Sequence, residues 1–107
     1  MNKPLWQPSE KLKRNSILRD FCHFINFKSS YNFKELWQWS IKNPEEFWSK
    51  FWDYSKIIGD KGSEIIKKNE IFNQSKFFPD SKLNYAENIL KKKSNNIAIN
   101  FLSEKGY

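Results

Sequence analysis

The chain has very few of the residues that build catalytic and metal sites. It contains one histidine, His23, and one cysteine, Cys22, in 107 residues. Without a Cys-x-x-Cys or His-x-x-x-His spacing, it offers too few ligands for a zinc or redox site. Its three glycines are too few, and too far from any strand-to-helix junction, to form a phosphate-binding loop: Gly59, Gly62 and Gly106. We therefore predict no catalytic, cofactor-binding or metal-binding residue in this chain.

The chemically active side chains that are present have structural interpretations. Cys22 stands in the apolar stretch 21–25, which is typical of a small buried hydrophobe, and a single thiol fits a reducing cytoplasm. His23 lies in the same stretch with no nucleophile in a motif nearby, so we expect a structural role. The adjacent carboxylates of Glu45 and Glu46 would point about 100° apart on a helix, which suits dipole complementation better than shared acid–base work.

Arginine is scarce although the formal net charge is +7. Only Arg14 and Arg19 are arginines among 19 basic residues, and the lysines are scattered along the chain. Nucleic-acid interfaces favour arginine and cluster their charge, so we expect no nucleic-acid partner. Single-stranded nucleic-acid binding on the aromatic rings remains an alternative, and it requires steeply salt-dependent affinity.

Long hydrophobic runs are also missing. No run approaches the roughly 18 apolar residues of a membrane span, and the N-terminus lacks the hydrophobic region of a signal peptide. We therefore expect a cytoplasmic protein with no membrane partner.

Aromatic residues, by contrast, make up 18% of the chain, and their spacing predicts several short amphipathic helices after an N-terminal arm. The arm covers the first eight residues, which include two prolines, and Trp6 would anchor it. The first helix runs from about Ser9 to Ile25, with Ser9 or Asn15 as its cap. A second helix follows a capping box of Asn32 and Glu35, and a third begins at Pro44 with Asn43 as its cap.

The second half of the chain is less regular. The pattern over 59–75 is compatible with a short helix or an irregular wrap, and 77–79 forms an apolar, non-helical knot. Asn84 and Glu87 have the spacing of a cap for a short helix that ends near Leu90. The lysines at 91–93 suit the negative end of that helix, although contact with a phosphate is an alternative.

The last residues predict a β-strand over 96–102 and a turn over 104–106. The fold class is therefore mainly α, with an N-terminal arm and one C-terminal strand. A lone strand has nothing to pair with. We expect it to belong to the α/β domain of a longer enzyme, so that 1–95 forms a helical region and 96–107 begins an interrupted second domain.

Four segments carry a resemblance that extends over nearly the whole chain. They are Trp-Gln-Pro-Ser at 6–9, Leu-Trp-Gln-Trp-Ser-Ile at 36–41, Phe-Trp-Ser-Lys-Phe-Trp at 47–52 and Phe-Pro-Asp-Ser-Lys-Leu-Asn-Tyr-Ala-Glu-Asn-Ile-Leu at 78–90. In order and spacing they resemble the N-terminus of the acetoacetyl-CoA synthetases, members of the acyl-adenylate-forming superfamily. The last segment is the most specific, because acetyl-CoA synthetases differ there. Phe77 departs from the family, which more usually has tryptophan.

The resemblance implies an enzyme that activates acetoacetate with ATP to an acyl-adenylate and transfers the acyl group to coenzyme A, assisted by magnesium. In that family the ATP loop, the adenine-binding motif and the catalytic lysine lie downstream of the region matched here. The resemblance therefore implies an inactive isolated chain whose partner is the missing nucleotide-binding domain of the same enzyme. The alternative is a small helical interaction module that docks its aromatic surface on another protein.

Overall fold

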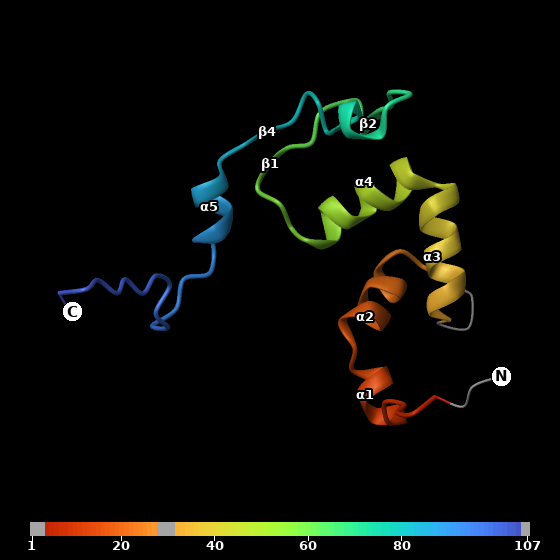
Figure 1. Cartoon of the computed structure of the whole chain (residues 1–107), viewed down its shortest axis with the longest axis horizontal. Helices are drawn as coiled ribbons and strands as arrows, with labels where there is room; N and C mark the ends of the chain where they lie inside the picture. Colours follow the sequence, from red (N-terminus) through yellow and green to blue (C-terminus); the bar gives the residue numbers. More distant parts are fainter. Residues whose placement is uncertain (1–3, 28–31, 106–107) are drawn as a thin grey trace.

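The computed structural model describes residues 4–27 and 32–105. These residues form five α-helices and four two-residue strands, so the mainly α class is confirmed. Figure 1 shows the first four helices together, a long hairpin beside them, and the C-terminal residues leading away as an extended segment. The radius of gyration is 18.8 Å, whereas a compact domain of about 100 residues has about 13 Å. The chain is therefore an open arrangement around a small core.

The first predicted helix is divided in two by a serine. Helix α1 covers Glu10–Arg14 and α2 covers Ile17–Phe24. Ser9 caps α1 as predicted, but Asn15 ends this helix instead of beginning one. The Oγ of Ser16 donates to the carbonyl of Lys13 at 2.8 Å and accepts from the amide of Arg19 at 3.2 Å. One side chain therefore closes α1 and starts α2, which separates them.

Helices α3 (Phe33–Lys42) and α4 (Pro44–Tyr54) meet at Asn43. Asn32 caps α3 as predicted, although its Oδ1 accepts from the amide of Lys34 rather than from Glu35. The helix start at Pro44 is also confirmed, with Glu45 and Glu46 in the first turn. Asn43 occupies the N-cap position of α4 as predicted, but its side chain makes no capping bond to α4, because its Nδ2 donates to the carbonyl of Trp39 at 3.1 Å. Asn43 thus closes α3 by its side chain and leaves α4 to begin at the proline.

The core lies where α2 meets α3 and α4. Its buried members are Phe21, Cys22, Ile25 and Leu36, with Phe27, Trp39, Phe47 and Tyr54 half-buried around them. The ring of Phe21 meets the rings of Phe47 and Tyr54 edge-on at centroid distances of 6.0 and 5.1 Å, a favoured aromatic geometry. The hydroxyl of Tyr54 donates to Asp20 Oδ2 at 2.9 Å, which ties α4 to α2.

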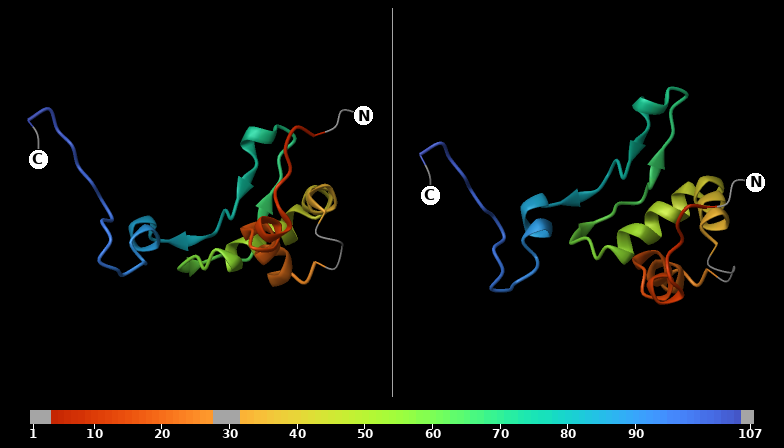
Figure 2. Two further views of the ribbon diagram at one scale, coloured as in Figure 1. Left: turned by 90° about the horizontal axis from the view of Figure 1, so that it is seen from below. Right: turned by 60° about the horizontal axis from the view of Figure 1, so that its bottom comes forward.

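Residues 59–83 form a hairpin that the sequence pattern did not predict. Strand β1 (Gly59–Asp60) pairs antiparallel with β4 (Lys82–Leu83), and β2 (Ile66–Lys67) pairs antiparallel with β3 (Lys76–Phe77). A 3₁₀ turn, η1 (Phe72–Gln74), lies near the tip. Figure 2 shows the two short ladders as successive pairs of arrows along one arm. The short helix expected within 59–75 is present as η1, but the paired strands on either side of it were not predicted.

The final helix, α5 (Tyr85–Ile89), begins at the predicted cap, since Asn84 Oδ1 accepts from the amide of Glu87 at 3.1 Å. The strand expected over 96–102 is absent from the structure, and this prediction is wrong for the chain as described. The apolar side chains there are 72–81% exposed, because no neighbouring strand offers the hydrogen bonds and burial that a strand needs. The turn at 104–105 is confirmed, while Gly106 lies outside the described residues.

At the other end, 4–9 contains no helix, as expected for an arm, and residues 1–3 lie outside the described part. Trp6 is largely exposed, which contradicts its predicted role as an anchor. None of the helices formed by the described residues is long and apolar enough to cross a membrane.

Candidate functional site

The residues considered for chemistry do not come together. Cys22 is 2% exposed in the core, whereas His23 is exposed on the outside of α2. Burial raises the pKa of the Cys22 thiol, which keeps it protonated and unreactive. Glu45 and Glu46 lie in the first turn of a different helix, α4. Within 4–27 and 32–105, no three histidine, cysteine or carboxylate side chains are close enough to hold a metal ion.

The prominent feature of the surface is exposed apolar side chains on three elements. On α3, three large side chains at four-residue spacing form one stripe and are 52–66% exposed: Phe33, Trp37 and Ile41. On α5, Tyr85 and Ile89 are exposed at the same spacing, and beyond it four side chains are exposed along the extended segment: Ile97, Ile99, Phe101 and Leu102. Single exposed apolar residues are ordinary, but rows of them are typical of surfaces that contact another protein. The candidate site is therefore an interaction surface.

Helix α4 holds the hairpin in place through two aromatic pairs and one cation. Trp48 packs on Phe77 with ring centroids 5.4 Å apart, and Trp52 packs on Phe78 at 4.9 Å. Lys61 Nζ lies 2.8 and 2.9 Å from the two carboxylate oxygens of Asp53. The apolar knot predicted at 77–79 is therefore the contact between hairpin and helix, and phenylalanine at 77 keeps a ring in that contact.

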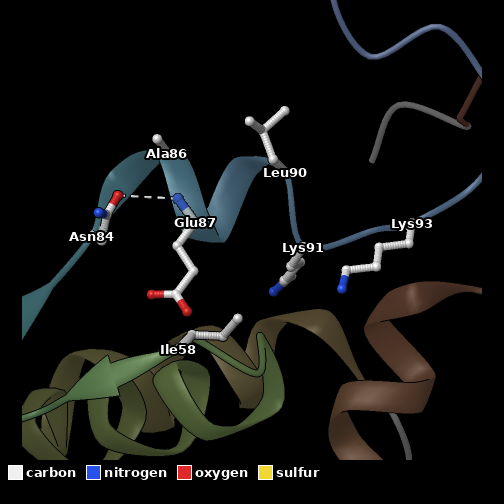
Figure 3. Close-up of a pocket in the computed structure, with 7 residues that line it drawn as sticks. All are labelled: Ile58, Asn84, Ala86, Glu87, Leu90, Lys91 and Lys93. Carbon is white, nitrogen blue, oxygen red and sulfur yellow. Dashed lines mark hydrogen bonds between the residues drawn. The ribbon is translucent and has the colours of Figure 1, made fainter.

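A recess of about 370 Å³ separates α5 from the segment that follows α4. Its lining residues are drawn in Figure 3: Ile58, Asn84, Ala86, Glu87, Leu90, Lys91 and Lys93. Figure 3 shows the side chains of Glu87 and Lys91 extending across the recess toward the segment that carries Ile58. The recess is open and its lining carries charges of both signs.

Hydrogen bonds cross this junction from two residues of the 84–91 segment. Asn88 exchanges two bonds of 2.8 Å with the backbone of Ile58, one in each direction. Lys91 Nζ donates to the carbonyls of Ser55 and Lys56 at 2.9 and 3.1 Å. The prediction that the lysines at 91–93 serve the end of α5 itself is therefore wrong for Lys91. Sequence reasoning missed both contacts, because their partners lie 30 to 36 residues upstream.

Comparison with known proteins gives one family and one kind of relative. The family described as "Acetyl-coenzyme A synthetase N-terminus" matches residues 33–89. An acetoacetyl-coenzyme A synthetase of Rhizobium meliloti (strain 1021) is 28% identical over 95% of this chain and 16% of its own length. Acetoacetyl-CoA synthetases of Gallus gallus and Xenopus tropicalis are 31% and 36% identical over 95% and 87% of this chain, and 16% and 14% of their own lengths. No solved structure matches this chain.

Proposed function

Because the chain belongs to the acetyl-coenzyme A synthetase N-terminus family, we propose that it is a non-catalytic N-terminal segment of an acetoacetyl-CoA synthetase. The family match and the names of the relatives confirm the resemblance that its sequence carries. The chain spans about one sixth or less of the length of the curated relatives it matches. Its function is therefore to pack against the rest of such an enzyme and complete that enzyme's fold.

The observation that carries this proposal is the exposure of the apolar segment 97–102 and of the α3 stripe (Phe33, Trp37 and Ile41). Side chains alternate between the two faces of a strand, so Ile97, Ile99 and Phe101 would share one face if the segment were paired. In the proposed enzyme this segment is a strand of the nucleotide-binding domain, and 1–95 is the helical region that packs against that domain. Exposed without that domain, these side chains favour aggregation.

The reaction of the complete enzyme is the ligation of acetoacetate to coenzyme A through an acyl-adenylate, with ATP and magnesium. The names of the relatives support the substrate and the coenzyme A product. This chain's own residues supply packing surfaces and take no part in the chemical steps. The enzyme acts in the cytoplasm, as the single cysteine favours, and needs neither nucleic acid nor membrane.

A graft into the Xenopus tropicalis enzyme tests the proposal. Three proteins are compared for ATP-dependent formation of acetoacetyl-CoA: the enzyme without the 98-residue region matched by this chain, the same enzyme with this chain in that position, and this chain alone. We expect the deletion to abolish activity, the graft to restore it, and the chain alone to form no product. Full activity of the deletion, or product formation by the chain alone, would contradict the proposal.

A further inference from the structure

The geometry points to a latch, formed by Asn88 and Lys91, that fixes α5 against the end of α4 and so sets the place from which the chain leads on to the segment 97–102. The role of the latch in docking rests on the proposed function. The latch itself is independent of that proposal, because all of its contacts lie within this chain.

The first half of the latch extends a β-ladder with a side chain. Gly59 pairs with Leu83, and Ile58 is the next residue on the β1 side of that ladder. The Ile58 amide donates to Asn88 Oδ1, and Asn88 Nδ2 donates back to the Ile58 carbonyl, both at 2.8 Å. A carboxamide has the acceptor and the donors of a peptide group, so Asn88 replaces a backbone partner. Its second Nδ2 proton goes to the carbonyl of Asn84 at 2.9 Å, which fixes the amide within α5.

The second half of the latch supplies a charge that α4 lacks. The end of a helix carries unpaired carbonyls and a partial negative charge, and basic residues in the last turn usually compensate both. Helix α4 has no basic residue in its last turn. Lys91, 35 residues beyond Lys56, places its ammonium on the carbonyls of Ser55 and Lys56 instead. The cation therefore lies on the carbonyls of the C-cap residue Ser55 and of the residue after it, at the negative end of α4.

Apolar packing does not hold α5 in this place. The helix has five residues, none of them buried, and Tyr85 and Ile89 are exposed. A helix this short is not stable on its own in water. Its position relative to α4 is therefore set by the β1–β4 ladder on one side and by the polar contacts of Asn88 and Lys91 on the other. Five residues, 92–96, lead from Lys91 to the segment 97–102, so the same contacts set the point from which that segment starts.

Distance distributions between two spin labels test the latch in the full chain. The labels are placed on Glu45→Cys in α4 and Asn95→Cys after α5, with the buried Cys22 replaced by alanine. We expect one narrow distribution, and at least about a twofold broadening in Asn88→Ala/Lys91→Met, because a hydrogen bond contributes about 1 kcal/mol and several are lost. The single variant Lys91→Arg keeps both the charge and the hydrogen-bond donors, so its distance distribution should stay as narrow as that of the parent chain. Asn73→Ala/Lys92→Met is the matched control, since both side chains lie outside the latch.

Hydrogen exchange at the Ile58 amide gives a second reading that does not depend on labels. Asn88→Ala should accelerate this exchange by about tenfold while the amides of α4 keep their protection. Equal distribution widths in the latch and control variants, or unchanged exchange at Ile58, would overturn the latch. If a latch variant also unfolds α4, faster exchange of the α4 amides will show it. In that case Asn88→Asp is the deciding variant, because it keeps only the acceptor for the Ile58 amide. Its exchange rate at Ile58 should then lie between those of the parent chain and Asn88→Ala.

The graft separates the latch from the proposed function. In an active graft, Asn88→Ala/Lys91→Met should lower the rate of acetoacetyl-CoA formation at least about threefold more than the control pair. Equal rates would show that the latch serves no docking purpose. An inactive graft with a narrow label distribution and a protected Ile58 amide would contradict the proposed function and leave the latch supported.

Discussion

The indole ring of Trp52 on α4 and the ring of Phe78 in the hairpin pack with their centroids 4.9 Å apart. Phe78 has φ +49°, a left-handed conformation that costs a bulky residue about 1 kcal/mol or more. Its amide donates to the carbonyl of Ile65 at 2.8 Å across the hairpin. The strained backbone and the ring contact therefore belong together, because the left-handed turn directs the ring at α4 and the contact offsets its cost.

Two substitutions at Phe78 distinguish the contribution of the ring contact to stability from the cost of the left-handed backbone. Phe78→Ala should lower the free energy of unfolding by about 1–2 kcal/mol through loss of the ring pair and its buried area. Phe78→Gly loses the same ring but relieves the left-handed strain, so it should be no less stable than the alanine variant. Urea unfolding of both variants measures this. A glycine variant that is about 1 kcal/mol less stable than alanine, as on an ordinary backbone, would contradict the prediction.

Gly59 is required where β1 meets β4. It has φ +151°, and a Cβ there would lie 2.6 Å from the Lys82 carbonyl oxygen and 2.7 Å from Leu83 Cβ. Gly59→Ala should therefore cost about 1–3 kcal/mol of unfolding free energy by forcing the ladder apart. Exchange of the Ile58 amide, next to the ladder, should accelerate as well. Ser63→Ala, an exposed position in the same hairpin, is the control and should stay within about 0.5 kcal/mol of the parent chain.

Lys61 binds the hairpin to α4 through Asp53 and Ser49. Its Nζ donates to both carboxylate oxygens of Asp53 and to Ser49 Oγ at 3.0 Å, and its side chain is 25% exposed while that of Asp53 is 52% exposed. Solvent screens such a pair, so Lys61→Met should cost only about 0.5–1 kcal/mol. A double-mutant cycle with Asp53→Asn should give a coupling that shrinks at high salt. A cycle that shows no coupling at low salt would contradict the bond.

Local signals were predictable from the sequence, and long-range ones were not. Helix starts at Ser9, Asn32, Pro44 and Asn84 follow from residues within three positions of the cap, and all four are confirmed. The hairpin was not predictable, because strands of two residues have no detectable periodicity and because paired residues such as Gly59 and Leu83 lie far apart in sequence.

The same distinction explains the errors at the C-terminal end. The residues at 96–102 have the composition of a strand, but forming one depends on a partner strand that the described residues do not supply. The sequence pattern predicts Lys91 at the nearest helix end, whereas its partners at Ser55 and Lys56 depend on how the hairpin returns the chain to α4. The spacing of apolar residues on α3 predicts a buried stripe of Phe33, Leu36, Trp37 and Ile41, but only Leu36 is buried. Which of these side chains is covered depends on packing against other elements, so the exposed surface was not predictable from α3 alone.

Cys22 should behave as a buried hydrophobe in solution. It is 2% exposed, and burial raises the pKa of its thiol, so both access and the fraction of reactive thiolate are low. We expect no reaction with a chromogenic disulfide reagent at pH 8 in the folded chain, and one equivalent of reaction after addition of urea. Immediate stoichiometric reaction without denaturant would show that the α2 core is open.

The free energy of unfolding should fall more steeply with rising alkaline pH in the parent chain than in a chain without the Tyr54 hydroxyl. Burial raises the pKa of its phenol, and the hydrogen bond to the Asp20 carboxylate raises it further. A group whose pKa is higher in the folded state contributes stability that is complete below the unfolded pKa, about 10 for tyrosine, and that is lost as pH rises toward the folded value. Urea unfolding between pH 8 and about pH 11 should therefore show a steeper decline for the parent chain than for Tyr54→Phe. Tyr85→Phe, on the exposed face of α5, is the control and should keep the parent profile. Identical slopes for the parent and Tyr54→Phe would mean that the bond between α4 and α2 does not form.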